Sequence, residues 1–194
     1  MSNESFRFTP AAPADVSDEN ALLRASLAEA QRRIEALEQA AEIDPLTRLP
    51  TESRFLRGLE RVVAQAERHG TPAAMLHIDV RGLGAINEHH GSLAGDSALK
   101  HVAERVSGLI RATDHLANLG GGRFALLLDH LDQDSAIDAA ERIARCIAGD
   151  PLDLGGSRLS IEVAVAATGI LRGDTVDEVL RRADQNLARA KAGN

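Results

Sequence analysis

Apolar runs at regular intervals divide most of the chain into short strands separated by longer helices. Residues 73–80 (AAMLHIDV) are almost continuously apolar, which predicts a buried strand. Two more apolar runs, 116–119 and 124–128, flank three glycines and predict a tight β-hairpin, because glycine readily adopts the positive φ of such turns. A stretch rich in β-branched residues predicts a further strand at 159–166. Together these runs predict a small sheet built around an antiparallel hairpin.

Helices are expected between these strands, where apolar residues recur every three or four positions. Thr51 can cap the first helix, which Thr71-Pro72 ends, and the segment 96–110 carries its apolar residues on one helical face. Further helices are expected at 135–148 and 175–192. Helices interspersed with strands predict an α+β fold in which helices pack on the sheet.

The N-terminal part of the chain has a different pattern. Residues 1–18 are polar and rich in proline and alanine, and we expect them to form a disordered polar tail. A helix is expected at 19–43, where apolar residues alternate at spacings of four and three. The residues of this heptad pattern are Leu23, Leu27, Ala30, Ile34, Leu37 and Ala41. Two interpretations stay open: a parallel coiled coil with a second copy, and a single amphipathic helix packed on its own domain.

Composition excludes several classes of protein. The formal charge of −7 argues against a nucleic-acid partner, which would need a basic face. The chain has no apolar run of membrane-spanning length and no signal-peptide pattern at its start, so we expect no membrane partner and a cytoplasmic location. The chain has four Phe but neither Trp nor Tyr, so the core must be aliphatic. Cys146 is the single cysteine, and we expect it to be a buried structural thiol.

Two short motifs carry a resemblance to a known family. Residues 120–124 read GGGRF and resemble the signature turn of GGDEF domains, the diguanylate cyclase family. Residues 44–50 (DPLTRLP) are similar to that family's opening motif D-x-L-T-G-L-x, with Arg48 in the glycine position. The resemblance covers residues 44–194. It implies a ferredoxin-like sheet of the cyclase and polymerase palm type, with the long helix at 19–43 before it.

The resemblance also implies a GTP site. Asp79, at the end of the first strand, matches the first metal-binding aspartate of the family. Asn87 and Asp96 match the residues that read guanine, and Lys191 matches a lysine that contacts phosphate. The full set of residues implied for this vestigial GTP site is Asp79, Asn87, Asp96, Gly120, Gly121, Gly122, Arg123 and Lys191.

The chain departs from the family where the metal should bind. The third and fourth positions of the turn, acidic in the family, are Gly122 and Arg123, and the second acidic position after the first strand is Arg81. Divalent cations such as Mg²⁺ require several oxygen ligands, and Asp79 alone cannot hold the two metals of a cyclase. We therefore expect no catalytic residue, no metal site and no required cofactor.

The two arginines at these positions allow two interpretations. Arg81 and Arg123 could hold a triphosphate directly, without a metal, while Asn87 and Asp96 read guanine. The simpler interpretation is that both are solvated surface residues of a decayed site. His89 and His90, which are adjacent, are also expected to be surface residues rather than a chelating pair.

A second ligand site is implied before the hairpin. Arg111 and Asp114 match the RxxD inhibitory site of the family, which binds the product cyclic di-GMP. Arg142, in the helix after the hairpin, matches a third position of that site. Arginine can stack on guanine and donate to its Hoogsteen edge or to phosphate, and aspartate can accept from the N1–H and N2–H groups of guanine.

These residues leave three functional hypotheses. The first is an inactive signalling protein that binds cyclic di-GMP at Arg111, Asp114 and Arg142 and relays it to a protein partner, as a homodimer formed through residues 19–43. The second is a scaffold protein that dimerises through the same helix without binding a nucleotide. The third is a protein with residual GTP binding or weak diguanylate cyclase activity.

Overall fold

The computed structural model describes residues 14–40 and 42–193, which fall into two compact units divided after Ala40. Helix α1 (Ala14–Ala40) lies in the first unit and begins before the expected start at residue 19. The expected polar tail lies outside the described residues as far as residue 13. Along α1, the side chains of Leu22, Leu23, Leu27 and Leu37 are all exposed.

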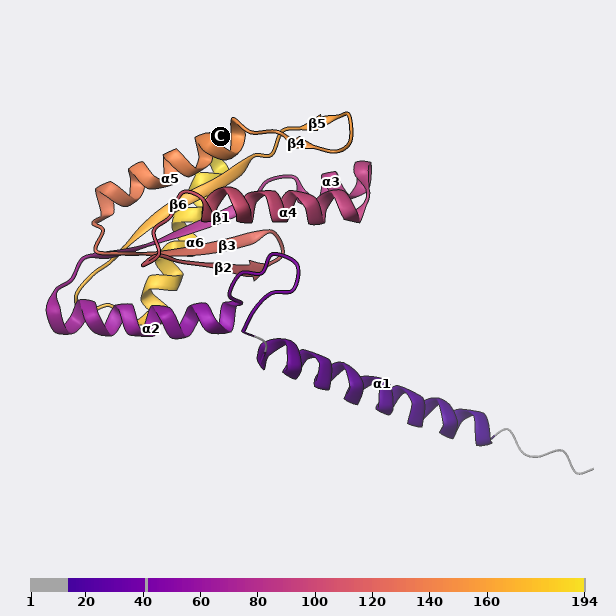
Figure 1. Ribbon diagram of the computed structural model, residues 1–194. Coiled ribbons are helices and arrows are strands. Elements are labelled where there is room, and N and C mark those ends of the chain that lie inside the picture. Colours follow the sequence, from indigo (N-terminus) through magenta and orange to yellow (C-terminus); the bar gives the residue numbers. More distant parts are fainter. Residues whose placement is uncertain (1–13, 41, 194) are drawn as a thin grey trace, which may run out of the picture. The chain divides into compact units, whose positions relative to one another are not determined.

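The second unit is an antiparallel sheet covered by helices (Figure 1). The sheet has the strand order β2-β3-β1-β6, and a separate ribbon pairs β4 with β5. The strands are β1 (Ala73–Val80), β2 (His115–Gly120), β3 (Arg123–Asp129), β4 (Leu152–Asp153), β5 (Arg158–Leu159) and β6 (Val163–Ile170). The helices are α2 (Glu52–His69), α3 (Leu83–His90), α4 (Ser92–Ser107), α5 (Gln133–Ala148) and α6 (Val176–Ala192). This arrangement confirms the predicted ferredoxin-like α+β fold.

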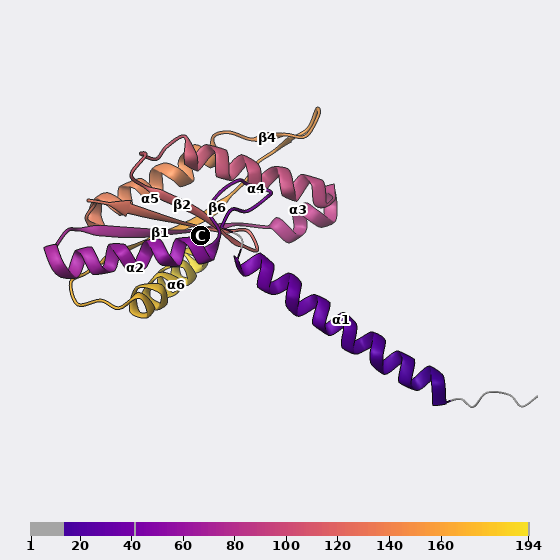
Figure 2. The ribbon, with the colours of Figure 1, turned by 60° about the horizontal axis from the view of Figure 1, so that its bottom comes forward.

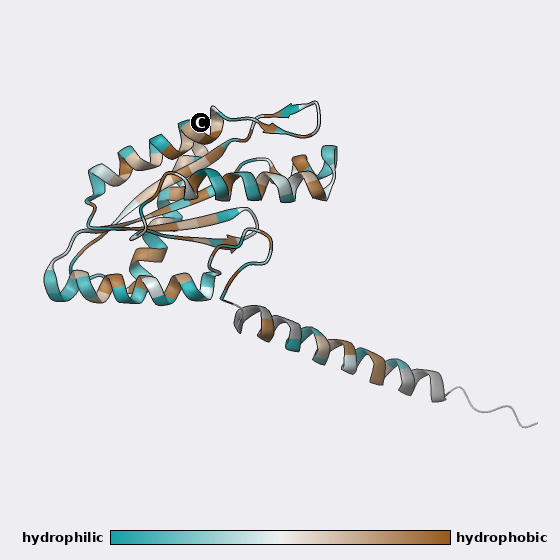
Figure 3. Cartoon of the chain, viewed as in Figure 1, coloured by the Kyte–Doolittle hydropathy of each residue, from teal (hydrophilic) through white to brown (hydrophobic). Residues whose placement is uncertain are grey.

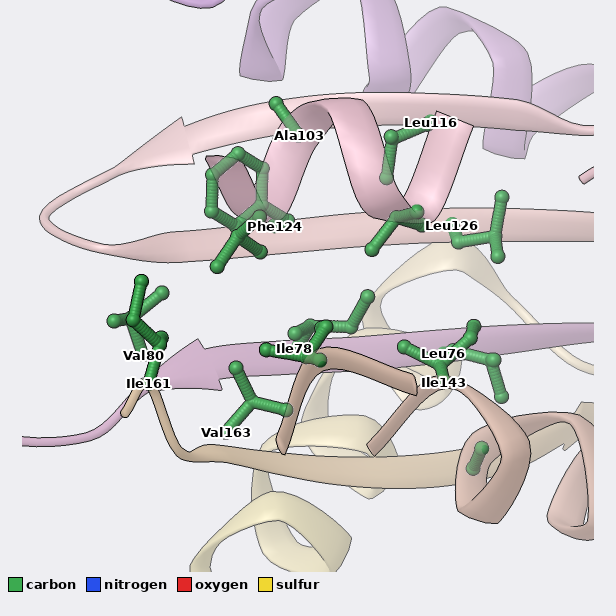
Figure 4. Close-up of a cluster of buried hydrophobic side chains, with 14 of the residues drawn as sticks. Leu76, Ile78, Val80, Ala103, Leu116, Phe124, Leu126, Ile143, Ile161 and Val163 are labelled. Atoms are coloured by element: carbon green, nitrogen blue, oxygen red, sulfur yellow. The ribbon is translucent and has the colours of Figure 1, made fainter. Parts of the chain in front are cut away.

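Helices cover both faces of the sheet, α2 and α6 on one face and α4 and α5 on the other (Figures 1 and 2). Successive residues of a strand point to opposite faces, so β1 supplies both layers. Leu76 and Ile78 pack with Phe124 in one cluster, which Figure 4 shows, whereas Met75 packs with Leu59 in the other. Both clusters are almost entirely aliphatic, as the composition predicts.

The predicted hairpin is confirmed. Strands β2 and β3 are joined at Gly121 and Gly122, whose φ angles are +60° and +83°. Such angles are strained for residues with a Cβ, and the glycines allow the tight turn. Gly120 pairs with Arg123, after a register shift between Asn118 and Gly120.

The motif at residues 44–50 forms a turn that is tied to the edge of the sheet. Asp44 Oδ1 accepts hydrogen bonds from Thr47 N (2.7 Å), Thr47 Oγ1 (2.6 Å) and Asn118 Nδ2 (3.0 Å). Although burial acts to raise it, these hydrogen bonds hold the pKa of Asp44 below its ordinary value. Arg48 has a φ of +61°, so the position that is glycine in the resembling motif has a left-handed backbone here.

Three expectations need correction. The segment 96–110 belongs to a longer helical region in which Gly91, with a φ of +84°, separates α3 from α4. The last long strand is β6 rather than residues 159–166, because pairing with all eight residues of β1 selects Val163–Ile170 despite the alanines in it. Cys146 is partly exposed in α5 rather than buried.

Polar residues on the helices alternate with the apolar ones that face the sheet (Figure 3). In α2 the buried residues include Phe55, Leu59 and Val62, at spacings of four and three. Across residues 14–40 and 42–193, no helix has both the length and the apolar content required to span a membrane.

Candidate functional site

The carboxylate of Asp79 is engaged by a cation of the chain itself. Lys191 Nζ, near the end of α6, lies 2.6 Å from Asp79 Oδ2. Asp79 is mostly buried at 16% side-chain exposure, whereas Lys191 is 44% exposed. The structure therefore brings together two residues of the implied GTP site, but as an ion pair with each other.

Arg81 is turned towards the same helix end. Its Nη2 donates to the carbonyl oxygen of Ala190 at 2.9 Å and to that of Lys191 at 3.4 Å. The last carbonyls of a helix have no partner within the helix and carry partial negative charge, so a guanidinium stabilises them. Neither expected interpretation of Arg81, a triphosphate ligand or a solvated side chain, describes this contact. Arg81 anchors the C-terminal end of α6 to the end of β1.

Any side chain at position 122, where the family has a carboxylate, would require Leu83 to move. The backbone of Gly122 is buried, and its carbonyl accepts a hydrogen bond from Val80 N at 2.9 Å. A Cβ added to Gly122 would lie 2.9 Å from Leu83 Cδ2, closer than real Cβ contacts. The neighbouring Arg123 is exposed. In the backbone register of β3 and β1 it lies opposite Asp79.

The residues at this end of the sheet do not fit a centre for two divalent metals. Asp79 is paired with Lys191, and the space beside Gly122 is occupied by Leu83. Among the described residues, no three His, Cys, Asp or Glu side chains lie close enough together to hold a metal ion.

The two residues expected to read guanine lie on adjacent helices. Asn87 is exposed on α3, and its side chain covers Gly95 of α4, the residue before Asp96. A Cβ at Gly95 would overlap the Asn87 side chain, so this glycine lets the two helices approach. Asp96 is partly exposed. The structure thus keeps Asn87 and Asp96 near each other, at an open surface.

His77 lies buried in the centre of β1, on the face covered by α6, and sequence reasoning missed it. Its Nδ1 is 3.5 Å from Asp184 Oδ1, and within the described chain neither ring nitrogen has a hydrogen-bond partner. Burial lowers the pKa of His77 below its ordinary value of 6.5, against the opposing charge of Asp184. The sequence signal that could have identified His77 as a buried residue was its position within a continuous apolar run.

A separate cavity of about 330 Å³ brings together all three residues predicted to bind cyclic di-GMP. Arg111 and Asp114 line it from the turn before β2, and Arg142 lines it from α5. The turn is held locally, because Arg111 N donates to Asp114 Oδ2 at 2.8 Å and Asp114 N donates to Arg111 O at 3.1 Å. The Asp114 carboxylate is therefore held in place by a hydrogen bond within its own turn.

The α5 wall of this cavity adds charged residues that sequence reasoning did not single out. Asp138 and Arg145 line the cavity beside Arg142, at successive turns of the helix. The helix begins at an Asp132 cap, whose side chain accepts from Ser135 N at 2.8 Å. This hydrogen bond lowers the pKa of Asp132. The spacing of 138, 142 and 145 along one helix face was the signal that could have identified them.

Known proteins similar to this chain point to one family. The family model described as "Diguanylate cyclase, GGDEF domain" matches residues 41–194. The diguanylate cyclase DgcP of Pseudomonas aeruginosa is 34% identical over 158 residues, which make up 81% of this chain and 24% of DgcP. This chain thus spans about a quarter of the length of that relative.

Two solved structures extend the comparison. The diguanylate cyclase SiaD of Pseudomonas aeruginosa, in complex with its activator SiaC, has a TM-score of 0.75 and 26% identity, covering 93% of this chain and 70% of SiaD. A microbial GGDEF domain that interacts with bis-(3,5)-cyclic di-GMP has a TM-score of 0.69 and 26% identity, covering 81% of this chain and 95% of that domain.

Proposed function

Because this chain belongs to the GGDEF domain family of diguanylate cyclases, we propose that it is a non-catalytic signalling protein that binds cyclic di-GMP. The observation that carries this proposal is a single cavity lined by Arg111, Asp114 and Arg142. It lies apart from the site where Lys191 neutralises Asp79. Binding without catalysis follows from keeping the first site and losing the second.

The chemistry of the cavity suits a guanine nucleotide. Cyclic di-GMP presents two guanine edges and two negatively charged phosphates. Arg111 and Arg142 can donate paired hydrogen bonds to O6 and N7 of guanine or to phosphate oxygens. Asp114 can accept from the N1–H and N2–H groups of guanine. A related GGDEF domain with 26% identity interacts with the same ligand, which supports this assignment.

The proposed loss of cyclase activity rests on the charges at the other end of β1. Joining two GTP molecules requires metal ions that stabilise the attacking and leaving oxygens. In this chain, a lysine pairs with Asp79, and glycine stands where the family has a second carboxylate. Arg81 and Arg123 add positive charge to this region. We propose that Mg²⁺ does not bind here and that the reaction is lost with it.

Isothermal titration calorimetry with cyclic di-GMP tests the binding proposal. The wild type should bind, and Arg111→Ala should abolish binding while leaving the thermal melting curve unchanged. Arg158→Ala serves as a matched control, because Arg158 is an exposed arginine on the separate β4–β5 ribbon. No heat from the wild type would refute the proposal and favour the scaffold hypothesis.

A chromatographic assay with GTP and Mg²⁺ tests the proposed loss of catalysis. We expect no cyclic dinucleotide product above the background of a reaction without protein. Asn87 and Asp96 remain near each other, so the protein could still bind GTP. GTP binding without formation of product would agree with both this proposal and the hypothesis of residual GTP binding. Formation of cyclic di-GMP would contradict the proposal directly.

The proposal extends to the partners of the protein. Exposed Leu23, Leu27 and Leu37 on α1 favour pairing with a second copy in a parallel coiled coil, since water-exposed leucines gain from mutual burial. The 26% identical SiaD has been solved with an activator protein, SiaC. By analogy, we propose that this domain passes the cyclic di-GMP signal to a protein partner.

A further inference from the structure

The proposed cyclic di-GMP cavity is lined by arginine and aspartate side chains from two parts of the chain. The turn before β2 supplies Arg111 and Asp114, and α5 supplies Asp138 together with Arg142 and Arg145. The motif that identified the site accounts for one carboxylate only. Two further carboxylates line the cavity: Asp129, whose Oδ2 lies 3.7 Å from His130 Nε2, and Asp138 on α5, which needs a reason of its own.

Asp138 is an unfavourable residue beside a phosphate. A carboxylate near a ligand with two negative charges opposes binding, unless it accepts hydrogen bonds from that ligand. In the described part of the chain, Asp138 and Arg142 form no ion pair with any residue, so the carboxylate is not needed to neutralise that arginine. It is exposed and free to meet a ligand.

Arg145 is held loosely where it could join Asp138. Its Nη1 lies 3.2 Å from Glu141 Oε2, and the two side chains are 71% and 63% exposed. An ion pair this exposed contributes little to stability, so a ligand can replace Glu141 at small cost. The guanidinium then gains acceptors in the cavity that it already lines.

We propose that Asp138 and Arg145 form a second guanine reader, so that the cavity recognises both bases presented to it rather than one. In this arrangement Asp138 accepts from N1–H and N2–H of the second guanine, and Arg145 donates to its O6 and N7. The inference rests on the proposed binding of cyclic di-GMP. It adds that the site selects for a ligand with two guanines.

Three cyclic dinucleotides separate this inference from a general charge effect. Calorimetry would compare cyclic di-GMP, the mixed cyclic GMP–AMP, and cyclic di-AMP, on the wild type and on Asp138→Asn. Adenine lacks the N2 amino group and the N1 proton that a carboxylate recognises. The wild type should therefore lose affinity in two steps as each guanine becomes adenine.

Asp138→Asn should weaken cyclic di-GMP binding roughly tenfold or more, because it removes a charged acceptor of the ligand. The variant should also distinguish cyclic di-GMP from the mixed dinucleotide less than the wild type does, with Arg145 as the remaining contact to the second guanine. Asp134→Asn is the control, since Asp134 is an exposed carboxylate on the same helix outside the cavity. Arg145→Ala should weaken binding of cyclic di-GMP more than that of cyclic di-AMP.

The opposite result would overturn the inference. If Asp138 only repels the phosphates, Asp138→Asn binds all three dinucleotides more tightly and keeps the two-step order of the wild type. That result leaves the proposed function intact, because the wild type and Arg111→Ala still differ. A wild type that binds none of the three dinucleotides refutes the proposed function itself, and the inference with it.

Discussion

Lys191 Nζ lies 2.6 Å from Asp79 Oδ2, so the C-terminal helix supplies a cation to the carboxylate at the end of the central strand. Arg81 binds the carbonyls of the same helix end. Asp79 and Arg81, at the end of β1, therefore both contact the C-terminal end of α6. We therefore expect substitutions in this region to change the stability of the protein.

Restoring an acidic residue in the turn should destabilise the protein. Gly122→Glu places a Cβ 2.9 Å from Leu83 Cδ2, at a φ of +83°. Strain and overpacking together should lower the free energy of unfolding by about 2 kcal/mol, measured by urea denaturation. Leu83→Ala should restore part of this loss when it is combined with Gly122→Glu, because it removes the methyl group that the new Cβ would meet. A double variant Gly122→Glu, Arg123→Glu with cyclase activity would contradict our account of the site.

Removing the Arg81 guanidinium should loosen α6. Arg81→Met keeps most of the side-chain volume but loses the hydrogen bonds to Ala190 O and Lys191 O. We expect the free energy of unfolding to fall by about 1 kcal/mol, since hydrogen bonds from charged groups at partly exposed positions contribute modestly. Hydrogen exchange at the last turn of α6 should accelerate. If Arg81 served a triphosphate instead, stability would be unchanged and GTP affinity would fall.

Stability should depend on pH through His77. Burial lowers its pKa in the folded state, so below about 6.5 the unfolded chain binds more protons than the folded chain. This contribution is complete above pH 6.5 and is lost as the pH falls through that value towards the folded-state pKa. His77→Leu should flatten the stability profile between pH 7 and 5 in urea titrations. A profile that keeps the wild-type slope in His77→Leu would exclude His77 as its source.

Arg48 should be improved by glycine. The φ of Arg48 is +61°, a region where a Cβ is unfavourable and glycine is not. Arg48→Gly should raise the thermal midpoint, by an amount corresponding to about 0.5–1 kcal/mol. Arg57→Gly, in the middle of α2, is the control and should have the opposite effect. A lower midpoint for Arg48→Gly would show that the Arg48 side chain has a role that outweighs its backbone strain.

The oligomeric state should depend on the leucines of α1. A Leu23→Glu, Leu27→Glu variant should convert a dimer to a monomer, because charged residues replace the apolar seam. Light scattering coupled to size-exclusion chromatography measures the mass. Arg24→Glu changes an exposed position beside this seam and should leave the mass unchanged. A wild-type monomer at micromolar concentration would refute pairing through α1.

The fold was predictable where local pattern and tertiary pairing agree. The run at 73–80 became β1 residue for residue, and the glycines at 120–122 formed the expected turn. The strand expected at 159–166 was displaced, because its register depends on β1, a partner distant in sequence. Helix α3 was missed because eight residues between two glycines carry too little periodicity.

The candidate sites were predictable only as far as the motifs reached. Arg111, Asp114 and Arg142 were identified from their resemblance to the inhibitory-site motif of the family, and the structure gathers them in one cavity. The ion pair of Asp79 with Lys191 joins residues more than a hundred positions apart, which no local pattern specifies. Side-chain partners of this kind follow from the packed fold.

Strand β3 runs from Arg123, opposite Asp79, to Asp129, which lines the cavity proposed to bind cyclic di-GMP. Its seven residues span about 20 Å. All seven residues of β3 pair with β1, and five of them also pair with β2, so the strand is held on both sides between the glycine turn and the proposed cavity. A rigid tilt of the strand by a few degrees at the cavity would therefore displace the glycine turn by about an ångström.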